Sequence, residues 1–127
     1  IAIAEKQPAD FFSVYKGRPI MIEAKTSRNL TSFPLYYSKN PAIAKHQIEA
    51  GLKLEKAGGI SLILIRREEY RNKKCYAISA QQAKALYKNK ENKKSIKWSW
   101  FEENAYIVER LKAPLRWNLQ KLYEQVI

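Results

Sequence analysis

The stretch Ile60–Arg66 constrains the fold of this chain more than any other stretch, because it is aliphatic on both sets of alternating positions. It reads Ile-Ser-Leu-Ile-Leu-Ile-Arg, with five large aliphatic residues among the six positions from Ile60 to Ile65. Successive side chains of a strand point to opposite faces of a sheet, so a strand that is apolar on both faces has to be covered on both. We therefore expect Ile60–Arg66 to be the central strand of an α/β fold, a sheet flanked by helices. The run is far shorter than a membrane-spanning helix.

A β-hairpin is predicted near the start of the chain. The aromatic and β-branched stretch Asp10–Tyr15 is followed by Lys-Gly-Arg-Pro, a turn signal, and then by Ile20–Lys25. Alternation along the second strand places Glu23 and Lys25 on one face, which tolerates charge. Its aliphatic residues, Ala24 included, lie on the other face, which we expect to be core.

The remaining elements follow from turn, cap and periodicity signals, and the length of the chain predicts a single domain over residues 1–127. In the first half of the chain we expect a weak strand over 1–5, a loop over 26–41 and a helix over 42–58 that ends at Gly58. A polar turn over 68–74 and a strand over 75–78 follow, and then a helix from a Ser79 cap to Tyr87 and a charged loop over 88–94. The capping-box spacing of Ser99 and Glu102 predicts a short helix, and a final helix is expected over 115–126 with Leu119, Leu122 and Val126 on one side.

One polar residue interrupts the apolar stripe predicted for the helix over 42–58. Ile43, Ala50, Leu54 and Ala57 fall on one side of that helix, and Gln47 falls among them. Two interpretations are open from spacing alone. Gln47 either lies at the rim of the stripe or aims a polar group at the sheet beneath.

The net charge narrows the choice of partners. The formal charge is +12, from 24 Lys and Arg against 12 Asp and Glu. A domain this basic is typical of proteins that bind a polyanion such as a nucleic acid. A membrane surface is the rival partner, but no long basic amphipathic helix stands out, so we expect no membrane association.

The single cysteine and the single histidine exclude several site classes. Cys75 has no partner for a disulfide within the chain, which fits a reducing interior and predicts a cytoplasmic protein. A zinc site of the Cys/His type is excluded for the same reason. Cys75 is interpreted as an ordinary strand residue, with a catalytic thiol as the alternative.

Two carboxylates and a lysine suggest phosphodiester chemistry. The chain reads Pro-Ala-Asp, then twelve residues, then Glu-Ala-Lys, which places Asp10, Glu23 and Lys25 at the ends of adjacent strands. Two carboxylates can bind a hard divalent cation, and an ammonium group can stabilise charge that develops on a phosphoryl oxygen. A surface ion pair on a strand is the alternative interpretation of this pattern taken alone.

Longer motifs around these residues resemble a known enzyme family. The stretch PADFFSVYKGRPIMIEAKTSRNLTSFPL is similar to RecU-type Holliday junction resolvases, which belong to the PD-(D/E)xK nuclease superfamily, and HQIEAGLKLEKAGGISLILI continues the similarity. The most specific elements are the D-F-x-x-x-Y-K-G hairpin, E-A-K, T-S-F-P and H-Q-I-E. The resemblance is good over residues 8–65 and weaker, but in order, to the end of the chain.

The resemblance implies a mixed sheet flanked by helices with a restriction-endonuclease-like core, in a protein that works as a symmetric homodimer. It also implies the reaction, in which a four-way DNA junction is cut by hydrolysis of two phosphodiesters with Mg²⁺ or Mn²⁺. Asp10 and Glu23 match the metal-binding carboxylates, and the backbone carbonyl of Ala24 is a further expected ligand. Lys25 matches the lysine that orients the attacking water and stabilises phosphorane-like charge, and Gln47 matches a helix glutamine near the site.

Candidates for DNA contact follow from charge and from the resemblance. His46 is turned by about 100° from Gln47 on a helix, so we expect a surface or DNA-contacting role for it rather than that of a base. Thr31, Ser32 and Phe33 either border the DNA or fix the shape of their loop. The candidate phosphate contacts are Lys16, Arg18, Arg28, Lys39 and Lys45.

One departure from the family leaves alternatives open. Family members carry an N-terminal helix with a further acidic residue and a basic segment, whereas this sequence starts just upstream of Asp10. We therefore expect an N-terminal segment to be missing from residues 1–127, with Glu5 as a candidate third carboxylate. The alternatives are a PD-(D/E)xK nuclease of another substrate class, such as a restriction-like, repair or phage enzyme, and a DNA-binding module with weakened catalysis.

Overall fold

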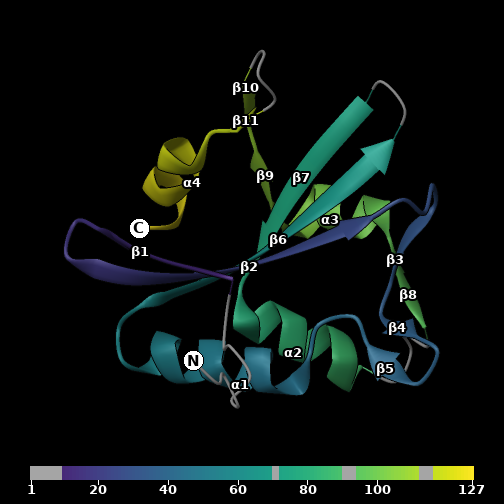
Figure 1. The fold of residues 1–127 in the computed structure, drawn as a ribbon, viewed down its shortest axis with the longest axis horizontal. Helices are drawn as coiled ribbons and strands as arrows, with labels where there is room; N and C mark the ends of the chain where they lie inside the picture. The colour runs from purple at the N-terminus through teal and green to yellow at the C-terminus, as the bar shows by residue number, and fades with distance from the viewer. Residues whose placement is uncertain (1–9, 70–71, 90–93, 112–115) are drawn as a thin grey trace, which may run out of the picture.

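A five-stranded sheet forms the centre of the computed structural model, which describes residues 10–69, 72–89, 94–111 and 116–127. The strands lie in the order β1 (Phe11–Tyr15), β2 (Arg18–Ser27), β6 (Ile60–Glu69), β7 (Asn72–Ile78) and β9 (Tyr106–Val108). β6 lies in the middle of the sheet, parallel to β2 and antiparallel to β7 (Figure 1). The predicted central strand is confirmed.

Helices cover both faces of this sheet. One face packs against α1 (Lys45–Lys56), α2 (Ala80–Lys88) and α3 (Trp98–Asn104), and the other packs against α4 (Leu119–Val126) (Figure 1). The expected α/β class, a mixed sheet flanked by helices, is therefore confirmed. None of the helices in the described part of the chain is long and apolar enough to cross a membrane.

The hairpin of β1 and β2 is tighter than the sequence predicts. Lys16 and Gly17 alone form its turn, with φ of 50° and 77°, while Tyr15 already pairs with Arg18. Two positive φ values are those of a type I′ turn, whose twist matches that of the strands and which favours glycine. β1 pairs with β2 only as far as Ile22, so the second half of β2 extends past the end of β1.

Several short or polar strands lie where loops are expected. In the predicted loop over 26–41, β3 (Ser32–Pro34) pairs with β8 (Ser95–Lys97), and β4 (Tyr36–Tyr37) pairs with β5 (Asn40–Pro41). Strands of two or three residues are too short to give a periodic pattern. The predicted turn over 68–74 is wrong for a different reason, because β6 and β7 run into it and bring Glu68 opposite Lys73. Opposite charges on facing strands stabilise the pairing there.

The apolar stripe predicted for α1 is wrong. The helix begins at Lys45 and ends at Lys56, and Gly58, with φ of 94°, ends it as expected. Its buried residues are Ile48 and Gly51, whereas Ala57 is exposed. A glycine adds nothing to a hydrophobic pattern, yet here it lets the helix backbone approach the sheet closely.

Of the helices in the second half of the described chain, α2 begins where it is predicted, whereas α3 and α4 do not. The helix capped by Ser79 is confirmed as α2, with the Gln82 N–H donating to Ser79 Oγ. The capping box of Ser99 and Glu102 is wrong, because the cap of α3 is Lys97 and the helix is anchored by its buried Trp98 and Phe101.

The final helix α4 starts only at Leu119, after an Asn118 cap, and buries Leu122 and Tyr123. Just before it, β10 (Arg110–Leu111) pairs with β11 (Arg116–Trp117). The strand predicted over 1–5 lies outside the described residues.

We expect Gly51→Ala to destabilise the fold. A Cβ at this position would overlap the Ser61 hydroxyl of β6 and lie 2.7 Å from the Ala80 Cβ of α2. The helix propensity gained from alanine, about 1 kcal/mol, is smaller than the roughly 1–3 kcal/mol that such overpacking costs. Urea unfolding checks this, with Lys53→Ala on the exposed side of the same helix as the control. A Gly51→Ala protein as stable as the control would contradict the close packing.

Candidate active site

The part of β2 that extends past β1 carries two of the predicted catalytic residues, Glu23 and Lys25. Asp10 lies just before β1, and its Oδ2 accepts a hydrogen bond of 2.9 Å from the Ala24 N–H. This carboxylate therefore continues the ladder between the strands by one bond after the backbone pairing has ended. The bond fixes Asp10 beside the Glu23–Ala24–Lys25 segment.

Glu23 is a buried carboxylate whose two oxygens have different surroundings. The residue is 6% exposed, and its Oε1 lies 3.2 Å from Lys25 Nζ. Its Oε2 is buried and has no hydrogen-bond partner among the described residues. A buried polar atom without a partner is costly, so a group that binds Oε2 would stabilise this site.

Ala24 is exposed, so its predicted place in the core is wrong. A cavity of about 710 Å³ opens on its face of the sheet between β1, β2 and α4, lined by Phe11, Leu64 and Trp117 among others. The N–H and C=O of one strand residue point to the same side of the strand. The Ala24 carbonyl therefore faces the same side as its N–H, which is the side of Asp10.

These groups suit a divalent cation that keeps much of its water. Within the described residues, no group of three or more His, Cys, Asp and Glu side chains could hold a metal ion. Mg²⁺ does not need such a group, because it usually binds through one or two carboxylates and keeps several waters. Two carboxylates, one of them with an unpartnered oxygen, and a backbone carbonyl fit that requirement.

Comparison with known proteins assigns the chain to a family. The sequence profile of the family described as Recombination protein U (RecU) matches residues 2–123. The chain belongs to the RecU family.

Three curated RecU relatives, each named Holliday junction resolvase RecU, illustrate the similarity. The protein of Shouchella clausii is 35% identical over 100 residues, which cover 79% of this chain and 45% of the relative. That of Pediococcus pentosaceus is 34% identical over 108 residues, which cover 84% of this chain and 50% of the relative. That of Bacillus subtilis is 31% identical over 112 residues, which cover 87% of this chain and 50% of the relative. The chain thus spans about half the length of the curated relatives it matches.

The helix residues of the H-Q-I-E motif lie near the start of α1. Gln47 is half-buried, and its Oε1 accepts a hydrogen bond of 3.1 Å from the Ala44 N–H, which caps the helix. His46 is half-buried as well and lines a shallow depression together with Lys45 and Glu49. Lys45 Nζ lies 3.8 Å from Glu49 Oε1 in an exposed ion pair.

The candidate phosphate contacts lie at different places in the structure rather than in one patch. Lys16 and Arg18 lie at the turn of the hairpin, and Arg18 is about 17 Å along β2 from Glu23 at the usual rise per residue. The Arg18 Nε donates to the Gly58 carbonyl, and the Lys16 ammonium lies 5.4 Å from the centre of the Tyr15 ring. Arg28, by contrast, directly follows β2 on the side of the candidate active site. Lys39 is exposed between β4 and β5.

The T-S-F-P loop is shaped by a residue that the sequence reasoning missed. The Asn29 side-chain oxygen accepts bonds from the Thr31 N–H, the Thr31 hydroxyl and the Ser32 N–H. Phe33 is buried, at 1% exposure, so of its two open interpretations the structure supports a role in the shape of the loop rather than at the border of the DNA. An Asn followed two residues later by Thr is a common side-chain turn, and that spacing was the available signal.

Cys75 is a structural residue of β7. It is 2% exposed, and burial raises the pKa of its thiol to about 12, against a smaller opposite effect of Arg66. Because the thiolate is the reactive form, we expect iodoacetamide at pH 8 to leave the native protein unmodified and to alkylate it after unfolding in urea. Equal rates of modification in the two states, measured by mass spectrometry, would contradict this burial.

A divalent cation should stabilise the fold through Asp10 and Glu23. At ten times its dissociation constant, Mg²⁺ or Mn²⁺ should add about 1.4 kcal/mol, a rise in Tm of roughly 4–6 °C. Thermal unfolding checks this in buffers of equal ionic strength. Asp10→Asn should remove the shift, and Glu103→Gln, an exposed carboxylate on α3, should retain it. No shift in the unmodified protein would argue against the site.

Proposed function

We propose that this chain carries the catalytic core of a Holliday junction resolvase, a restriction-endonuclease-like nuclease that cuts four-way DNA junctions in recombination and repair. The observation that carries the proposal is the Glu23 carboxylate, which is buried with one oxygen beside Lys25 and the other without a partner among the described residues. Membership of the RecU family and the names of its relatives support the choice of substrate. The charge of +12 supports a DNA partner.

The proposed mechanism assigns one task to each residue. Asp10, the Glu23 Oε2 and the Ala24 carbonyl would hold Mg²⁺ or Mn²⁺, which when bound polarises a phosphoryl oxygen and lowers the pKa of a bound water. The bond from the Ala24 N–H orients the Asp10 carboxylate before any metal arrives.

Lys25 is the proposed charge-stabilising group. Its ammonium lies against Glu23 Oε1, and its side chain is 23% exposed, so it can reach an incoming phosphate without leaving the site. An ammonium placed there stabilises the negative charge of the phosphorane-like transition state. The side-chain oxygen of Gln47 is occupied by the cap of α1, so its amide nitrogen is the group proposed to donate to the nucleophilic water or to a phosphate oxygen.

The wider assignments belong to the same proposal. We propose that the protein acts in the cytoplasm as a homodimer, with one active site for each of two opposed strands. Arg28, Lys45 and His46 are proposed to contact DNA directly. Thr31 and Ser32 contribute through the shape of their loop, and Lys16 and Arg18 contact DNA away from the scissile phosphate.

Asp10→Asn and Lys25→Ala should each reduce cleavage by at least ~100-fold, in line with the loss of one charge-stabilising group. Binding to DNA should largely survive, because most cationic side chains remain. Single-turnover cleavage of a labelled synthetic four-way junction with Mg²⁺ measures the first effect, and gel-shift titration measures the second. Glu103→Gln and Lys53→Ala are the matched controls and should cut normally. If either Asp10→Asn or Lys25→Ala cuts at the unmodified rate, the catalytic assignment is wrong.

The same assay tests the substrate class. A junction resolvase should produce paired, symmetric nicks in the four-way junction and leave linear duplex of the same sequence intact. Efficient cleavage of linear duplex would instead support a nuclease of another substrate class with the same catalytic centre.

A further inference from the structure

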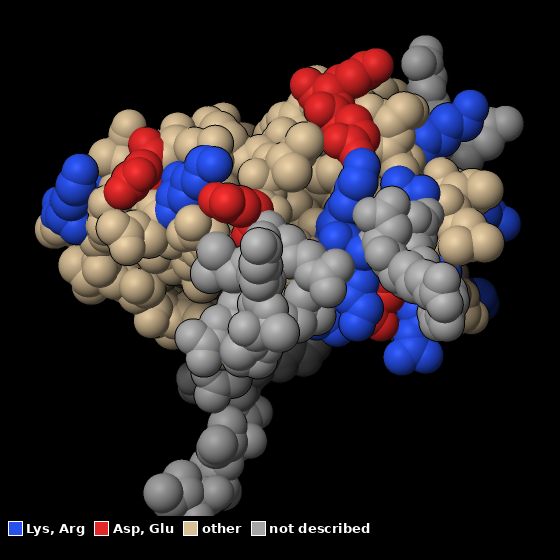
Figure 2. All heavy atoms as spheres, turned by 90° about the horizontal axis from the view of Figure 1, so that it is seen from above, with Lys and Arg blue, Asp and Glu red and all other residues tan. Residues whose placement is uncertain are grey.

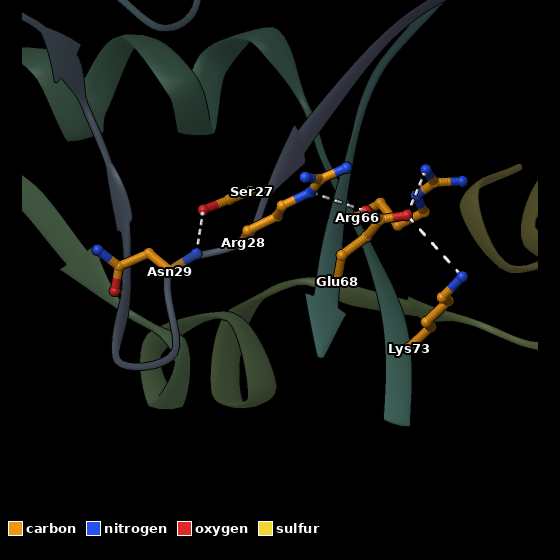
Figure 3. Close-up of polar contacts among 6 residues, drawn as sticks. All are labelled: Ser27, Arg28, Asn29, Arg66, Glu68 and Lys73. Atoms are coloured by element: carbon orange, nitrogen blue, oxygen red, sulfur yellow. Dashed lines mark hydrogen bonds and ion pairs between the residues drawn. The ribbon is translucent and has the colours of Figure 1, made fainter. Parts of the chain in front are cut away.

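Three cationic side chains converge on one carboxylate beyond the active-site end of β2. Glu68 Oε1 lies 2.6 Å from Arg66 Nη2 and 4.0 Å from Lys73 Nζ, while Glu68 Oε2 lies 3.4 Å from Arg28 Nε. Figure 3 shows the three cations approaching the carboxylate from different segments, the end of β2, β6 and β7. We name Arg28, Arg66, Glu68 and Lys73 the Glu68 cluster. Its three cations and one anion leave a surplus of positive charge.

Within the cluster, the carboxylate of Glu68 is less exposed to solvent than the cationic side chains around it. The side chain of Glu68 is 17% exposed, that of Lys73 is 37% exposed and that of Arg28 is 86% exposed. An arginine has five N–H donors, and among the described residues Arg28 uses only its Nε on Glu68. Its other donors are therefore available to a second anion, and the surplus charge attracts one.

The cluster lies beyond the end of the strand that carries the candidate active site, on the α4 face of the sheet. This is the face of Ala24, whereas Glu23 and Lys25 point to the opposite face. Arg66 is the register partner of Thr26, the residue after Lys25, and the cavity beside β2 is lined by Lys25, Thr26 and Arg66 together. Arg28 is three residues beyond Lys25, about 10 Å along the strand. The two positions can therefore meet phosphates that are a few nucleotides apart on one DNA strand. Figure 2 shows Lys and Arg side chains gathered side by side on the face seen from above, with carboxylate atoms among them.

We propose that the Glu68 cluster is a second phosphate-binding site, which takes a DNA backbone phosphate within a few nucleotides of the scissile phosphate. This inference rests on the proposed function, because it takes DNA to be the ligand. Arg28 and Lys73 bind the phosphate, since an arginine can form two parallel bonds to phosphate oxygens. Arg66, with the shortest contact to Glu68, keeps the carboxylate in place.

Glu68 acts in this site as a positioning residue. Arg28 and Lys73 are the exposed partners of Glu68, and ion pairs of exposed side chains contribute little to stability. They can therefore exchange the carboxylate for a phosphate while Arg66 remains paired with Glu68. In the absence of DNA the carboxylate keeps like charges side by side that would otherwise repel each other. The cluster therefore sets the register of one DNA strand relative to the catalytic centre, which a diffuse basic surface cannot do.

Replacing single phosphates by neutral methylphosphonates tests the proposal. Binding of junction DNA is measured without divalent metal, so that no strand is cut. In the unmodified protein, a neutral group at one position within a few nucleotides of the cleavage site should weaken binding by roughly fivefold, as expected for groups in direct contact. The variant Arg28→Gln/Lys73→Gln should bind all these DNAs with similar affinity. The variant Lys53→Gln/Lys84→Gln loses the same charge from exposed positions on α1 and α2 and should keep the fivefold effect.

The outcomes separate this inference from the proposed function. If the Arg28→Gln/Lys73→Gln variant keeps the fivefold effect, or if no phosphate in that region matters to a protein that does bind DNA, the second site is overturned. Failure of the unmodified protein to bind DNA overturns both proposals.

The variant Glu68→Gln tests positioning. It removes the carboxylate that competes with the phosphate, so the overall affinity for DNA should rise while the effect of a neutral group spreads over neighbouring phosphates. An effect that stays at one phosphate would overturn the role of Glu68.

Discussion

The candidate active site depends on the difference in length between two paired strands. β1 stops opposite Ile22, whereas β2 continues to Ser27 with β6 on its other side. The backbone groups that β1 would have paired with are thereby opened to other partners, and the Ala24 N–H takes the Asp10 carboxylate. A longer β1 would have filled this edge with backbone and left no place for a cation. The candidate site is therefore open because one strand ends before its partner does.

Two carboxylates organise the charges of this surface in opposite ways. Glu23 is buried, has one cation beside it and leaves an oxygen without a partner among the described residues, so it can take a further positive ion. Glu68 already has three cations around it, so its surroundings can take a further anion. A phosphodiester backbone with a metal ion at one phosphate satisfies both demands at once.

The sequence predicts what depends on local patterns and misses what depends on packing. The central strand, the hairpin, α2 with its Ser79 cap and the stop at Gly58 are all carried by local signals, and the structure confirms them. The buried face of α1 could not be predicted, because Gly51 matters through the approach of Ser61 and Ala80 rather than through its own hydrophobicity. The start of α3 at Trp98 was missed for a similar reason, since tertiary burial of its aromatic residues overrides a weak cap signal.

The candidate active site shows the same division between features that follow from local patterns and features that follow from packing. The motif gave Asp10, Glu23 and Lys25 as a set, and the structure brings them to one edge of the sheet. Nothing in the spacing indicated that the two oxygens of Glu23 would differ, or that Ala24 would be exposed. The Glu68 cluster was hidden because its members come from the end of β2 and from both strands of a hairpin that reads as a polar turn. Long-range convergence of this kind leaves no periodic trace in a single sequence.

The most direct test of the account is the position of a bound metal. Crystals grown or soaked with Mn²⁺ give anomalous difference density that locates the ion independently of any assay. The account predicts one peak per chain, about 2.1 Å from oxygens of Asp10 and Glu23, with the Ala24 carbonyl as a further ligand and water in the remaining positions. A peak elsewhere, or ordered water alone between Asp10 and Glu23 at saturating Mn²⁺, would contradict it.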